Sequence, residues 1–93
     1  MIVGIMTIDL FIPDSTSLKV KRSAVKSLKD RIRSRFNVSV AELDHNDKWQ
    51  RTSLGVVAVS NEGKHVESIL GNVLNLVDGF SRVQVIDKTI RYV

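Results

Sequence analysis

The order in which the chain changes its hydrophobic periodicity limits its fold more than any other sequence feature. Strands repeat every two residues and helices every 3.6, so the two kinds of element can be separated along the chain. The predicted elements are a strand, a helix, two strands, a helix and a strand, over residues 2–12, 18–36, 38–43, 49–60, 61–79 and 82–92. This β-α-β-β-α-β order is typical of one architecture.

That architecture is an α+β fold, the ferredoxin-like sandwich of four antiparallel strands with two helices on one face of the sheet. Right-handed crossovers place the first and third strands in its centre. Residues 2–12 are apolar at nearly every even position and at several odd ones, and Leu54–Val59 form a continuous apolar run, as central strands require. The polar interruptions of 82–92 suit an edge strand. With 93 residues, we expect residues 1–93 to form a single domain.

Both helical segments are amphipathic. The first follows Pro13–Ser17, where a Ser or Thr is expected to cap it. Its apolar face consists of Leu18, Val25, Leu28, Ile32 and Phe36. The apolar face of the second consists of Val66, Ile69, Leu70, Val73, Leu74 and Val77. Gly79 is expected to end the second helix as its C′ residue.

If both helices cover one face of the sheet, apolar side chains of the central strands remain on the other face. A monomer tolerates only a small exposed apolar patch. The sequence therefore predicts a homodimer, or a protein partner, that covers the open face or the strand edges.

Positive charge is concentrated in one segment. Residues 19–35 hold eight of the fourteen basic side chains and a single acidic one, whereas the rest of the chain is mildly acidic. Such asymmetry favours an anionic partner. The candidate RNA- or anion-binding residues are Lys19, Lys21, Arg22, Lys26, Lys29 and Arg33. All except Lys21 form one stripe beside the apolar face. The alternative interpretation is a solvated helix face without a ligand.

No pattern of catalytic residues is found. The absence of cysteine excludes disulfides, thiol nucleophiles and thiolate zinc sites. There is no G-x-S-x-G elbow, Walker A motif or dinucleotide fingerprint, and the loop after the first strand lacks the glycines of a phosphate loop. The third strand lacks the stacking aromatic residues of single-strand RNA readers. We therefore expect no catalytic residues, no cofactor and no enzymatic activity.

Two smaller features allow a functional and a structural interpretation. Asp44, His45, Asn46 and Asp47 could hold a metal, but Asp and Asn in a loop more often bond their own backbone, so we predict no metal site. Trp49 either packs over the hairpin or, together with Arg51, anchors an interface.

Several short motifs occur in a recognisable order. They are Ser17–Arg22 (SLKVKR), Arg35–Glu42, Asp44-His45, Trp49–Arg51 and Leu54–Val56. In this respect the chain resembles the YlxP-like family of small bacterial proteins. It departs from the family at Val20, where Glu is common and would complete a capping box. The resemblance implies a ferredoxin-like fold. It also implies a link to translation, because genes of the family often lie beside those of translation initiation and ribosome-maturation factors such as ribosome-binding factor A. It implies no particular activity.

The function we expect is that of a non-catalytic, RNA- or ribosome-associated protein that binds through its basic first helix. The alternative is a homodimeric protein-interaction or small-ligand regulatory module without a nucleic-acid role. A cytoplasmic location is expected, because no apolar run approaches the length of a membrane span and no export signal precedes the first strand.

Overall fold

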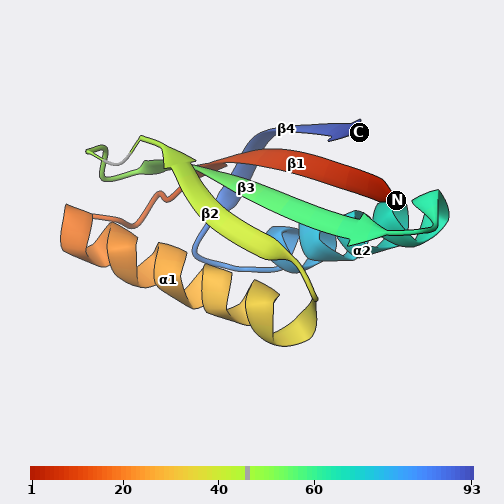
Figure 1. The fold of residues 1–93 in the computed structure, drawn as a ribbon. Coiled ribbons are helices and arrows are strands. Elements are labelled where there is room, and N and C mark those ends of the chain that lie inside the picture. The colour runs from red at the N-terminus through yellow and green to blue at the C-terminus, as the bar shows by residue number, and fades with distance from the viewer. Residues whose placement is uncertain (46) are drawn as a thin grey trace.

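The chain folds in the predicted β-α-β-β-α-β order (Figure 1). The structure is a computed structural model and describes residues 1–45 and 47–93. Its elements are β1 (Ile2–Phe11), α1 (Leu18–Arg35), β2 (Ser39–Asp44), β3 (Arg51–Ser60), α2 (Gly63–Asp78) and β4 (Gln84–Tyr92). Each bound lies within two residues of the prediction, and the ferredoxin-like fold class is confirmed.

The four strands form one antiparallel sheet in the order β2-β3-β1-β4. The two most continuously apolar strands, β1 and β3, are therefore central, and β4 is an edge, as predicted. Figure 1 shows both helices on the same side of the sheet, with α1 beneath β2 and β4 at the far side of the sheet.

The two faces of the sheet differ in burial. On β1 the even positions from Gly4 to Leu10 are buried beneath the helices, while the odd positions are only half-buried. The helix-covered core includes Met6, Ile8, Leu10, Leu54, Val56 and Ala58 from the sheet, Ala24, Val25, Leu28 and Ile32 from α1, and Val66, Leu70, Val73 and Val77 from α2. Every one of these residues is at most 4% exposed. The open face is apolar only in part.

Both ends of α1 follow from local chemistry. Ser17 is the N-cap, and its Oγ accepts a hydrogen bond of 3.2 Å from the backbone N–H of Val20. This bond satisfies one of the free N–H groups of the first turn. The helix ends at Arg35, because Phe36 turns to extended backbone and packs half-buried against the core. The predicted serine cap is thus present without the glutamate of a capping box.

The end of α2 differs from the prediction. Gly79 follows the last helical residue, but its φ of −83° and ψ of −5° are right-handed. It is therefore the C-cap, and its N–H bonds to the carbonyl oxygen of Asn75 at 3.1 Å. A C′ glycine would have left-handed backbone, but no glycine of the chain has a positive φ. No helix among the described residues is long and apolar enough to cross a membrane.

Gly4 allows α2 to approach the sheet closely. A Cβ atom at this position would collide with the Cγ1 of Val66 and lie 2.8 Å from the Cδ1 of Leu70. Strand glycines often mark such an approach. The missing side chain therefore sets how tightly α2 packs on β1.

We predict opposite effects of alanine at two glycines. Gly4→Ala should lower the free energy of unfolding by about 1–3 kcal/mol, because the stiff side chain of Val66 must move. Gly71→Ala is the control, since a Cβ atom there meets nothing within 4 Å. It should raise the free energy of unfolding by up to about 1 kcal/mol by favouring α2. Urea denaturation measures both, and equal effects would contradict this account.

Candidate nucleic-acid interface

Four of the predicted basic residues line one hollow of the surface. The hollow lies between α1 and β2 and has a volume of about 510 Å³. Its lining residues are Arg22, Val25, Lys26, Lys29, Asp30, Arg33 and Glu42. We call it the cationic cleft. Arg22, Lys26 and Arg33 are exposed and Lys29 is half-buried, so the four cations face solvent along one side of α1. Lys19 is exposed but does not line the cleft.

The structure corrects the placement of Lys21. This residue was grouped with the candidate anion-binding residues, but it is 1% exposed and cannot contact a phosphate. Its Nζ lies 3.1 Å from the Oε2 of Glu42 on β2. Lys21 therefore holds α1 to β2 and does not face a ligand.

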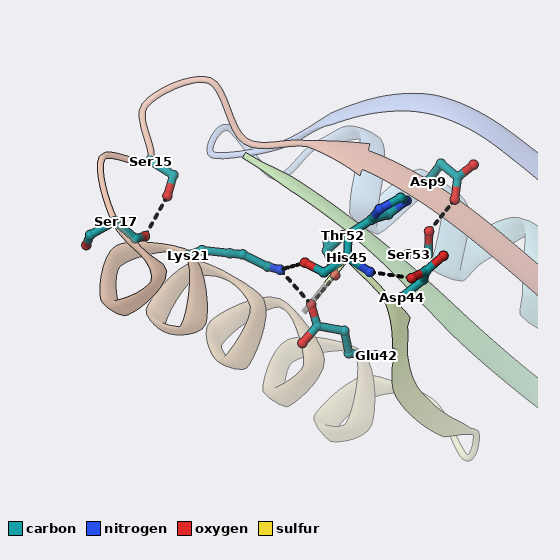
Figure 2. A network of polar contacts seen from close by, with 9 residues as sticks. All are labelled: Asp9, Ser15, Ser17, Lys21, Glu42, Asp44, His45, Thr52 and Ser53. Carbon is teal, nitrogen blue, oxygen red and sulfur yellow. Dashed lines mark hydrogen bonds and ion pairs between the residues drawn. The ribbon is translucent and has the colours of Figure 1, made fainter. Parts of the chain in front are cut away.

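Lys21 belongs to a polar network that joins α1 to the sheet (Figure 2). Besides its ion pair with Glu42, the Nζ of Lys21 donates a short hydrogen bond to the carbonyl oxygen of His45. The same Oε2 of Glu42 accepts a hydrogen bond of 2.5 Å from the Oγ1 of Thr52, a buried residue of β3. Glu42 therefore lines the cationic cleft, and the buried ammonium group of Lys21 neutralises its negative charge.

The sequence holds part of the signal for the position of Lys21. Lys21, Val25, Leu28 and Ile32 follow one another at intervals of four, three and four residues, which is the spacing of the apolar face. Glu42 lies two residues after the buried Val40, so its side chain points to the same face of the sheet. Opposite charges at two inward-facing positions are the signal of a buried ion pair.

The remaining charges of the cleft are unevenly engaged. Lys26 pairs with Asp30 one helical turn away, at 2.7 Å, and both side chains are more than half exposed. The hydrogen bond from Lys26, reinforced by the charges of Lys26, Arg33 and Lys29, holds the pKa of Asp30 below its ordinary value. Among the described residues, Arg22 and Lys29 form no ion pair within the chain.

Arg33 connects the cleft to the edge of the sheet. Its Nη2 donates a hydrogen bond of 2.7 Å to the carbonyl oxygen of Val40 on β2. The guanidinium group carries five N–H donors, so one bond leaves others for an anion. Arg33 therefore has a fixed position at the cleft while remaining exposed.

The loop after β2 shows turn chemistry. The backbone N–H of His45 bonds to the Oδ1 of Asp44 at 2.7 Å, and the carbonyl oxygen of His45 accepts from the N–H of Lys48 at 3.1 Å. His45 has a φ of 65°, which is left-handed backbone. Asn46 lies outside the described residues. Elsewhere in the chain no group of three or more potential metal ligands comes together.

Trp49 and Arg51 lie apart from the cationic cleft. Trp49 is 56% exposed and lines a separate hollow with Asp47, Lys48, Gln50 and Arg51. Arg51 of β3 lies opposite Phe11 of β1 in the strand ladder. Its Nε is buried without a hydrogen-bond partner among the described residues. That Trp49 and Arg51 anchor an interface stays a prediction, and the structure does not join them to α1.

Comparison with known proteins identifies relatives over most of the chain. A family model described as "Protein of unknown function (DUF503)" matches residues 3–90. The "Uncharacterized protein YlxP" of Bacillus subtilis (strain 168) is 38% identical over 82 residues, which cover 88% of this chain and 89% of that protein.

Two solved structures share the fold. The de novo designed protein Foldit4 has a TM-score of 0.56 and 9% identity, with 100% of this chain and 97% of that chain covered. A de novo designed protein with ferredoxin fold has a TM-score of 0.53 and 12% identity, with 98% and 85% covered. At such identity the likeness concerns the fold alone.

We predict that the Lys21–Glu42 pair matters mainly when one partner is removed. Lys21→Met should lower the free energy of unfolding by about 2 kcal/mol, because it leaves the Glu42 carboxylate without its counter-charge. Adding Glu42→Gln should recover part of this loss. Lys19→Met, a control on the same helix, should change the free energy of unfolding by less than about 0.5 kcal/mol. Urea denaturation tests the series, and a second substitution that only adds to the loss would contradict the pairing.

Proposed function

The chain belongs to the DUF503 family, and we propose that it is a non-catalytic binding protein that holds the phosphate backbone of structured RNA, such as ribosomal RNA, in the cationic cleft. The observation that carries this proposal is the alignment of Arg22, Lys26, Lys29 and Arg33 around one hollow. Lysine and arginine side chains bind nucleic acid by neutralising phosphates and releasing counterions.

The length of the row favours an extended polyanion over a single phosphate. Arg22 and Arg33 are eleven residues apart, which is about 16 Å along a helix axis. Phosphates of one strand recur every few ångströms along the axis of a duplex. The row can therefore face several successive phosphates, whereas a small anionic ligand would use only part of it.

The chemistry around the row favours recognition of the backbone over recognition of bases. No aromatic side chain lines the cleft. Sequence-specific readers of single-stranded RNA depend on aromatic stacking, whereas structured RNA is bound through phosphate, 2′-hydroxyl and shape. Another hollow of similar size, on α2, holds both Lys64 and Glu67 and lacks a comparable excess of positive charge.

Internal neutralisation adds to the positive character of the cleft. Its two acidic residues, Glu42 and Asp30, are each paired with a lysine, Lys21 and Lys26. The buried Lys21 does not touch a ligand, but it cancels the charge of Glu42 at the cleft floor. Arg22, Lys29 and Arg33 are then the cations most available to phosphates.

We predict that binding to an RNA hairpin depends on salt and on the cleft. With about three to five contacts, the slope of log K against log salt should lie near −2 to −4. Arg22→Gln with Lys29→Gln should weaken binding and make the slope shallower by about 1 to 2. Lys64→Gln with Lys48→Gln removes the same charge from exposed sites outside α1 and should have a smaller effect. Fluorescence anisotropy at several salt concentrations measures both. Equal losses in the two folded variants would remove RNA from this cleft and favour a protein partner.

The opposite change is expected at Asp30. Because its pKa lies below the ordinary value, Asp30 carries a negative charge in the cleft at every pH near neutrality. Asp30→Asn removes that charge and releases Lys26, so RNA should bind more tightly and the slope should steepen by up to about 1. The same anisotropy titration tests it. Asp78→Asn, an exposed acid at the end of α2, is the control. Weaker binding by Asp30→Asn would show that the ion pair orders the site.

A further inference from the structure

The outer side of β4 is a strand edge on which most backbone groups have no partner strand. The N–H and C=O groups of Val3 and Val93 bond to each other at 2.9 and 2.8 Å. Antiparallel ladders alternate, so residues 91, 89 and 87 also turn these groups toward β1. Those of Lys88, Ile90 and Tyr92 therefore point away from the sheet, where no further strand follows among the described residues. Of these groups, the N–H of Lys88 bonds to the Oδ1 of its neighbour Asp87 at 2.8 Å. Such a row is a template for another strand.

Apolar side chains lie along the same edge. Ile86, Ile90 and Tyr92 are 50%, 39% and 48% exposed. Ile90 pairs with the buried Met6, so it lies on the helix-covered face, yet α2 packs mainly over the two central strands. The edge of β4 thus combines free backbone groups with uncovered apolar surface.

The opposite edge of the sheet is protected. β2 has only six residues, and its charged residues, Glu42 and Asp44, are both acidic. The carbonyl oxygen of Val40 already accepts a hydrogen bond from Arg33. Two copies of β2 would bring acid against acid, and natural edges are often blunted in this way. A second strand therefore fits β4 better than β2.

We propose that two copies of this chain associate through β4, paired antiparallel with Thr89 opposite Thr89 of the partner subunit. This register places Asp87 opposite the partner's Arg91, and Arg91 opposite the partner's Asp87. The outward backbone groups of Lys88 then meet those of the partner's Ile90. A two-fold interface of this kind uses the same surface on both copies.

Charge selects this register among the alternatives. Centring the pairing on Asp87 or on Arg91 sets like charges against each other, which is destabilising. Centring it on Lys88 or on Ile90 leaves Asp87 and Arg91 without an opposite charge across the interface. A register whose two-fold axis lies between two consecutive residues would place the inward-pointing backbone groups of one β4 opposite the outward-pointing groups of the other. The register centred on Thr89 satisfies both the charges and the ladder.

The chain itself supplies a second reason for a cation at this place. Asp87 lies directly opposite Asp9 of β1, so two acidic residues face each other within one sheet. The Oγ of Ser53 donates a hydrogen bond to Asp9, and the backbone N–H of Lys88 donates one to Asp87. No ion pair compensates Asp87 among the described residues. The partner's Arg91 would supply the missing positive charge, since opposite charges across a strand pair are stabilising.

Exchange of the two charges tests the register. We expect the parent protein to have twice the chain mass of 10.4 kDa by light scattering at micromolar concentration. Asp87→Arg and Arg91→Asp should each weaken dimerisation by about tenfold or more, because each sets like charges together. The double variant restores opposite charges and should regain the dimer. Glu67→Arg and Lys64→Asp make the same charge changes on exposed sites of α2 and should leave the dimer intact.

A cysteine cross-link tests the two-fold axis independently. Because the chain has no cysteine, Thr89→Cys introduces a single thiol. Facing residues of a non-hydrogen-bonded pair lie about 4.5 Å apart at Cα, within the range of a disulfide. Mild oxidation should therefore give a covalent dimer for Thr89→Cys but not for Ser68→Cys on α2.

Three results would overturn the proposal. A parent protein that stays at the mass of one chain excludes the dimer. A dimer that ignores both charge exchanges and fails to cross-link through Thr89→Cys places the interface on the open face of the sheet. Single exchanges that dissociate the dimer without rescue by the folded double variant exclude this register.

Discussion

The buried ammonium group of Lys21 connects four parts of the molecule, and the cationic cleft depends on that connection. It links the start of α1 to Glu42 of β2, through Glu42 to Thr52 of β3, and directly to the turn at His45. An ion pair of this kind contributes less net stability than its Coulomb energy suggests, because the buried lysine loses its hydration and the half-buried glutamate loses part of its own. Its main effect here is positional, since it fixes the first turns of α1 at one distance from β2.

The fold could be predicted from the sequence because its elements are long and strongly periodic. The stripe on α2 has a clear helical period, and the short apolar run of β3 is rich in valine, which favours a strand; the order of the elements then limits the topology. The conformation of Gly79 could not be predicted, because glycine is compatible with both right- and left-handed backbone at a helix end. Local sequence does not decide between the two.

The candidate site was predictable only in part, for a related reason. Periodicity places Arg22, Lys26, Lys29 and Arg33 on one side of α1, and the structure joins them at one cleft. Periodicity does not distinguish a lysine at the margin of an apolar face from a lysine buried beneath that face. The distinction requires knowing that Glu42 lies across from Lys21. A tertiary partner therefore decides whether a basic residue belongs to the surface or to the core.

The strand order has a consequence for how tightly a polyanion could be held. Because β2 and β4 are opposite edges of the sheet, two copies joined at β4 carry their clefts at the outer ends and on the same face. With strands about 4.8 Å apart, the two clefts would be separated by roughly 30 Å. An RNA that reaches both makes its second contact intramolecularly, and such avidity can exceed either affinity by about 10²–10⁴. Weak individual clefts would then discriminate folded RNAs by their size, because a short hairpin can occupy only one of them.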